Sequence, residues 1–183
     1  MGCISKKMKD YCHDDKGATA VEFAMIGVPM VYLLLGIIEM AMMFTGMSVL
    51  DFATSEASRL IRTGQVQQSA GDPETVFKDA LCDAANVFLD CGKIQYEVIH
   101  MNGFGDFASH AASFDGDGNL VSQGFDAGSV NDVILIRAVY QYKLMTPLIA
   151  QFMGDGGGTT KRFVSTVVLE TEPYDVELVV DEL

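Results

Sequence analysis

Acidic and amide side chains alternate from Asp115 to Asn119, in the pattern of the first ligands of a calcium-binding loop. Asp115, Asp117 and Asn119 hold alternate positions, and Asp126 is the twelfth residue from Asp115. Leu120 stands where such loops carry glycine, and aspartate closes them less well than glutamate. The alternative is a solvated turn, because Asp, Gly and Asn favour turns for conformational reasons. These four residues are weak calcium candidates, and we predict no metal and no cofactor.

Other residues with catalytic side chains do not fall into a reactive pattern. Ser109 and Ser113 lie near His110, but without the Gly-x-Ser-x-Gly context of a nucleophile. His100 has no accompanying cysteine or histidine cluster that would form a zinc site. The glycine-rich run 154–158 precedes a predicted strand and lacks the Lys-Ser/Thr ending of a phosphate loop. The sequence therefore predicts a protein that is not an enzyme.

The most informative residues stand at a junction near the N-terminus. Gly17 follows a segment with four lysines, and Glu22 follows Gly17 by five positions at the edge of an apolar run. A glycine permits close approach of another backbone, as a peptidase requires. A carboxylate at a membrane edge is costly unless it is paired. Glu22 either has such a partner or marks the boundary between lipid and water.

The run after this junction is long enough to cross a bilayer. Residues from Phe23 to Ile38 include no charge, Glu39 interrupts, and apolar residues continue. About 20 helical residues span a hydrocarbon core of about 30 Å, so Phe23 to about Phe44 fits. A secretory signal has a shorter core with small residues after it rather than before it. The lysines before the run favour a cytoplasmic N-terminus.

The helical pattern continues beyond the predicted span. An apolar face with a spacing of three or four residues is formed by Met47, Leu50, Thr54, Ala57 and Ile61. We predict one helix over 18–62, with Pro29 inside it as a kink and Gly64 as its stop. Its first half suits lipid, and its second half suits the docking of a domain.

The stretch from Gly17 to Arg62 resembles the TadE-like minor pseudopilins of the tight-adherence pilus. The residues that carry the resemblance in this stretch are Gly17, Ala18, Val21 to Ala24, Pro29, Gly36 to Glu39 and Ala57 to Arg59. Later segments fall in the family's order, namely Val133 to Tyr140, Leu144 to Leu148 and Thr171 to Tyr174. Phe23 replaces the tyrosine of the major pilins, which also lack a sizeable globular domain. Both departures favour a minor subunit.

The resemblance implies a prepilin peptidase that cuts between Gly17 and Ala18. Glu22 would then pair with the N-terminal amine of a neighbouring subunit, with Phe23 beside it. Glu39 implies a polar contact between subunits in a helix bundle, and the alternative is a glutamate at the outer interface. The implied partners are the peptidase, other pseudopilins, the pilus assembly machinery and membrane lipid. The implied location is a single pass through the cytoplasmic membrane, with the C-terminal domain outside and incorporation in the pilus as one possible fate.

The predicted domains are a leader over 1–17, the helical segment over 18–64 and an extracytoplasmic α+β domain over 65–183. The helix predicted over 73–91 would hold Cys82 and Cys91 about 13 Å apart, too far for a disulfide. Either the helix breaks near 83–86 or the thiols stay reduced. Export favours a bridge, as does the resemblance to family members with paired cysteines, so we predict a Cys82–Cys91 disulfide and two short helices.

Strands are predicted over 94–98, 132–144, 162–172 and 176–180, with a short helical piece within 145–160, as an antiparallel sheet packed on the first helix. Arg137 is expected to pair with Glu170 or Glu172.

The net charge of −13 argues against nucleic acid as a partner, because phosphate would be repelled. The functional hypothesis is a minor pseudopilin in pilus assembly. The alternative is a single-span membrane sensor or ligand-binding protein with an extracytoplasmic domain.

Overall fold

The computed structural model describes residues 17–174. Residues 1–16, which belong to the predicted leader and include Cys3 and Cys12, and the strand predicted over 176–180 lie outside the described residues. Two compact units divide the chain, one ending at Ala41 and the other beginning at Met42. The helix α2 (Ala18–Arg62) contributes residues to both units. Its predicted bounds are correct, and the helix continues through Pro29.

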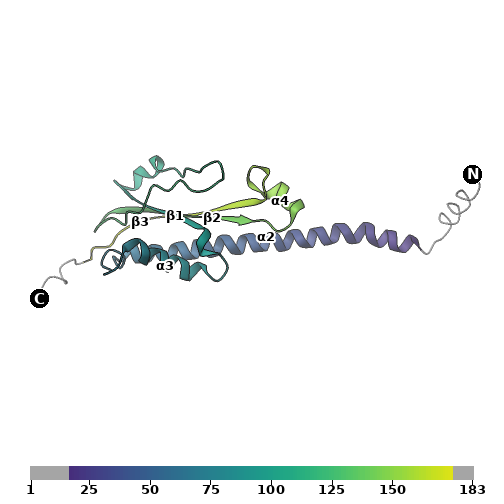
Figure 1. Cartoon of the computed structure of the whole chain (residues 1–183), viewed down its shortest axis with the longest axis horizontal. Coiled ribbons are helices and arrows are strands. Elements are labelled where there is room, and N and C mark those ends of the chain that lie inside the picture. The colour runs from purple at the N-terminus through teal and green to yellow at the C-terminus, as the bar shows by residue number, and fades with distance from the viewer. Residues whose placement is uncertain (1–16, 175–183) are drawn as a thin grey trace, which may run out of the picture. The chain divides into compact units, whose positions relative to one another are not determined.

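The second unit is an antiparallel sheet with helices on one face (Figure 1). The strands are β1 (Ile94–Met101), β2 (Val133–Lys143) and β3 (Thr160–Glu170), with β2 in the centre. The helices are the outer part of α2, α3 (Pro73–Ala85) and α4 (Pro147–Met153). Short 3-10 turns are η2 (Cys91–Lys93), η3 (Phe104–Ser109) and η4 (Asp155–Gly157). The predicted α+β class is therefore confirmed.

The outer part of α2 packs through the apolar stripe that its sequence predicts, with one exception. Leu50, Thr54, Ala57 and Ile61 are fully buried, whereas Met47 is 43% exposed. Gly46, rather than Met47, is the residue of this turn that faces β3. A Cβ at Gly46 would lie only 3.0 Å from the ring of Phe163. The absence of a side chain lets the helix approach β3 closely.

The core lies between these helices and the sheet. The side chains of β2 alternate between the two faces of the sheet, and Ile134, Ile136 and Ala138 are fully buried in this core. Phe77 of α3 packs against Tyr96 of β1, with ring centroids 5.5 Å apart. The opposite face of the sheet carries a smaller cluster formed by Ile99, Met101, Val133 and Leu135.

The helix α3 does not extend over the whole of 73–91. Asp72 caps its start, since its carboxylate accepts the Thr75 N–H at 3.1 Å. The helix ends at Ala85 rather than Cys91, and turns lead to the 3-10 turn η2. The predicted break near 83–86 is therefore confirmed, and the second short helix is only the three-residue 3-10 turn η2. Val87, which follows the end of α3, is 87% exposed.

Candidate functional site

The helix α2 begins at the residue that follows Gly17. Gly17 is exposed, and nothing lies within 4 Å of the place where a Cβ would stand. Glu22 follows Ala18 by four residues, about 6 Å or one helical turn, and it is exposed. Phe23 is 77% exposed. The backbone at Gly17 is therefore open to approach, and Glu22 and Phe23 are presented at the helix surface.

The first unit has the length and composition of a membrane span. One helix in the described part of the chain is long and apolar enough to cross a membrane, with a mean hydropathy of 2.2, and none of its most apolar window is buried. Large side chains such as Ile26, Leu33 and Ile37 are 57–71% exposed. This agrees with a single-pass membrane protein.

Glu39 differs from its neighbours on the helix. It is 2% exposed, whereas Ile38 is 55% and Met40 is 43% exposed. Glu22, in contrast, is exposed.

A shallow apolar groove runs along the outer part of α2. Its volume is about 510 Å³, and its walls come from α2 and from the end of α3 with the turn that follows. Phe44 and Phe52, two turns apart on α2, are 65% and 57% exposed, and Val87 forms the opposite wall. Nearly all of this surface is apolar, which is unusual for a solvated helix face.

The comparison with known families decides the nature of the N-terminal segment. Residues 17–59 match the family described as TadE-like protein. The match begins at Gly17 and ends near the end of α2, so it covers less than a quarter of the 183 residues. It supports a protein related to the tight-adherence pilus, of which TadE-like proteins are components. Comparisons with curated proteins and with solved structures gave no match.

The domain that follows the TadE-like segment contains the Cys82–Cys91 disulfide. The Cα atoms are 5.3 Å apart, within the normal range for a bridge. The early end of α3 makes this possible, because Asn86 to Asp90 turn the chain back toward Cys82. The bridge fixes the start of β1 against α3.

The calcium candidates of this domain are not brought together. The Asn119 side-chain amide donates to Asp115 Oδ2 at 3.0 Å, and the backbone N–H groups of Asp117 and Asn119 donate to Oδ1 at 3.0 and 2.7 Å. These hydrogen bonds, chiefly the one from the Asn119 side chain, lower the pKa of Asp115. Asp126 instead accepts the Gly128 N–H at 3.0 Å. Within residues 17–174 no three Asp, Glu, His or Cys side chains are grouped to hold a metal.

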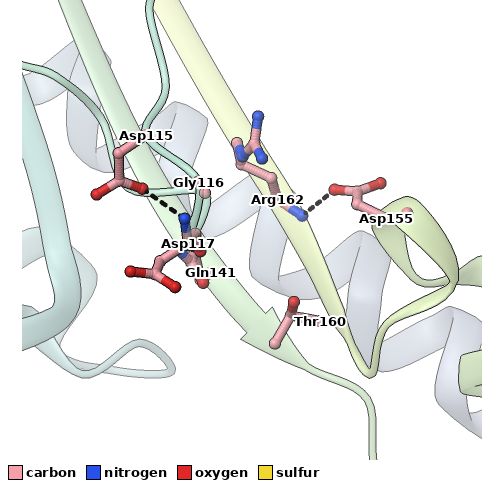
Figure 2. Close-up of a pocket in the computed structure, with 9 residues that line it drawn as sticks. Asp115, Gly116, Asp117, Gln141, Asp155, Thr160 and Arg162 are labelled. Carbon is pink, nitrogen blue, oxygen red and sulfur yellow. Dashed lines mark hydrogen bonds between the residues drawn. The ribbon is translucent and has the colours of Figure 1, made fainter.

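Asp115 and Asp117 border a polar pocket of about 250 Å³ (Figure 2). Asp155 approaches from another loop and accepts the Arg162 N–H at 2.8 Å. The Arg162 guanidinium lies 3.9 Å from the centre of the Phe114 ring, in a cation–π contact. The carboxylates of Asp115 and Asp155 accept backbone N–H groups of the chain itself, so these contacts hold loops on the sheet.

A serine, an aspartate and a histidine do meet in η3, but not in catalytic order. Ser109 Oγ donates to Asp106 at 2.5 Å, and His110 Nε2 lies 3.3 Å from the other Asp106 oxygen. The hydrogen bond from Ser109 is the main cause that lowers the pKa of Asp106. In a triad the histidine lies between the serine and the acid. Here the acid lies in the middle, so His110 cannot take the serine proton.

The pairing predicted for Arg137 is wrong. Arg137 pairs with Glu97, which faces it in the register of β1 and β2, and both side chains are buried. Glu97 also accepts the Gln123 N–H at 3.0 Å, and Arg137 donates to the His110 carbonyl at 2.7 Å. Glu172 pairs instead with Arg62 at 3.0 Å. The prediction missed Glu97 because the strand register is not visible in the sequence.

Proposed function

We propose that this chain is a minor TadE-like pseudopilin that is cut after Gly17 by a prepilin peptidase and takes part in assembly of a tight-adherence pilus. Its N-terminus lies in the cytoplasm, one helix crosses the cytoplasmic membrane, and the second unit lies outside. Its partners are the peptidase, other pseudopilins, the assembly machinery and membrane lipid. The fibre is one destination of the mature subunit.

The observation that carries the proposal is the coincidence at Gly17. The family match starts at this residue, the helix starts at the next, and an exposed carboxylate follows one turn later. Cleavage there leaves an amine at Ala18 and a helix that is ready to insert between neighbours. The Glu22 carboxylate of one subunit then neutralises the Ala18 amine of another, which lowers the cost of both charges in lipid.

The apolar groove supports a role in assembly beyond the membrane. Phe44, Ser48 and Phe52 share one face of α2 at a four-residue spacing. Such a face fits an apolar helix of a neighbouring subunit by interdigitation of side chains.

The deciding measurement is the mass of the mature N-terminus. The chain, expressed with its peptidase and purified from membranes, is expected to begin at Ala18. A chain that still begins at Met1, or one cut beyond Phe44, would reject the proposal. Gly17→Val is expected to abolish cleavage, because a branched side chain obstructs the approach of the peptidase backbone.

Variants of Glu22 separate assembly from processing. Glu22→Gln is expected to permit cleavage and membrane insertion but to strongly reduce pilus formation and co-purification of other pseudopilins. The matched control is Asp51→Asn, an exposed acid on the same helix, which should have little effect. The alternative, a single-span sensor or ligand-binding protein, predicts no cleavage and normal behaviour of Glu22→Gln.

A further inference from the structure

One end of the sheet adjoins the beginning of the second unit. The place of a Cβ at Gly46 is 3.0 Å from the ring of Phe163, near the start of β3. At the other end of β3, the Glu172 N–H donates to the Arg62 carbonyl at 2.8 Å. The strand β3 and the outer part of α2 therefore run in the same direction. The connection between β2 and β3, which contains α4, lies at the end where α2 enters the unit at Met42.

The helix α4 exposes large apolar side chains at this end. Ala150 is fully buried in the core and attaches α4 to the domain, whereas Phe152 is 83% exposed. Met145, just before α4, is 64% exposed. This end of the domain therefore exposes two large apolar side chains, one on α4 and one just before it.

Positive side chains gather at the same end in a domain that is otherwise acidic. The six Lys and Arg residues of 65–174 include four at this end, where β1 and β3 begin and β2 ends: Lys93, Lys143, Lys161 and Arg162. Asp90 and Asp155 pair with Lys93 and Lys161. Lys143 is exposed and forms no ion pair with another described residue. This end therefore offers cations beside exposed apolar groups, the combination that suits a lipid surface.

The length of the span indicates where the hydrocarbon core ends along α2. A hydrocarbon core of about 30 Å that begins at Phe23 ends about 20 residues later, near Met42 to Phe44. Met42, at which the second unit begins, then lies near the outer lipid headgroups.

We propose that α4 rests on the outer surface of the membrane. Phe152 and Met145 enter the boundary between headgroups and acyl chains, and Lys143 binds lipid phosphate. The domain then has a second attachment to the bilayer besides its span, which fixes the face it presents to other subunits. This inference rests on the membrane anchoring in the proposed function, and the experiment below separates the two.

The chain has no tryptophan, so one introduced tryptophan reports on one position. The probe at the proposed contact is Phe152→Trp in the full chain, reconstituted in nanodiscs of phosphatidylcholine and phosphatidylglycerol. The matched control is Phe104→Trp, because Phe104 is 57% exposed and follows β1 at the opposite end of the sheet. Leu33→Trp reports on the span itself.

Lipids with bromine near the headgroup end of the acyl chain should quench most of the emission from position 152 and little from position 104. Lipids with bromine near the chain ends should quench position 33. Quenching at 33 without quenching at 152 would overturn the lipid contact and leave the anchor intact. A tryptophan at 152 that is shielded from water but unquenched would place protein there and also overturn it. Loss of quenching at both positions would reject the anchor and the contact together.

The lipid composition tests the charged part of the contact. Quenching at position 152 should be stronger with phosphatidylglycerol than in phosphatidylcholine alone, and Lys143→Gln should reduce this difference. An unchanged difference in Lys143→Gln would overturn the assignment of Lys143 to phosphate.

Discussion

Removal of Arg137 should destabilise the second unit more than any other single change of charge discussed here. Arg137 and Glu97 are 3% and 1% exposed, so Arg137→Met leaves a carboxylate buried without its counter-charge. Loss of one member of such a pair costs about 3–5 kcal/mol. A domain of this size has a free energy of unfolding on the order of 10 kcal/mol. The variant should therefore lose a large part of its stability.

The assay is thermal unfolding of the full chain in detergent, followed by near-ultraviolet circular dichroism of the tyrosines. The midpoint for Arg137→Met should fall by on the order of 10 °C. The control is Arg62→Met, which breaks the exposed pair with Glu172 and should cost at most about 1 kcal/mol. The double variant Glu97→Leu with Arg137→Met should lose less than the sum of the single variants, because no buried charge remains. Equal losses for Arg137→Met and Arg62→Met would refute this reasoning.

Three further changes test other parts of the structure. Gly46→Val should lower the free energy of unfolding by about 1–3 kcal/mol, because the valine side chain would collide with Phe163 and Phe88. Urea unfolding measures this loss. The control Gly116→Ala should show no such loss, because the space at Gly116 is open. Cys82→Ser should cost about 2–3 kcal/mol for a loop of this length, and its melting midpoint, unlike that of the parent, should not respond to reductant. The lowered pKa of Asp115 stabilises the fold above the ordinary aspartate pKa, and this contribution is lost as pH falls below about 4. Asp115→Asn should therefore show a smaller fall in melting midpoint between pH 5 and pH 3, and an equal fall would contradict that role.

The elements with strong periodicity could be predicted from the sequence. Both ends of α2 were predicted, since an apolar run, a four-residue stripe and Gly64 define them, and Gly64 has the positive φ of a helix stop. The three described strands were found to within a few residues because their side chains alternate. The apolar pattern alone suggested a longer α3, because it continues to Phe88, and the predicted disulfide indicated the break near 83–86. The Cys82–Cys91 disulfide is incompatible with a straight helix over 73–91.

Less of the candidate site than of the fold could be predicted from the sequence. Gly17 and Glu22 could be singled out because their spacing is local and the family match begins at Gly17. The partner of Arg137 depends on register, and the burial of Glu39 depends on packing, so neither can be read from neighbours in the chain. Phe152 gave no signal, because a phenylalanine in a short helix normally predicts a core residue.

The common direction of α2 and β3 has a mechanical consequence. A pull along the membrane span, as during extraction of a subunit from the bilayer, loads the interface between Gly46 and Arg62 in shear. Contacts near Phe163 and near Glu172 would then share the load, rather than break one after another as in peeling.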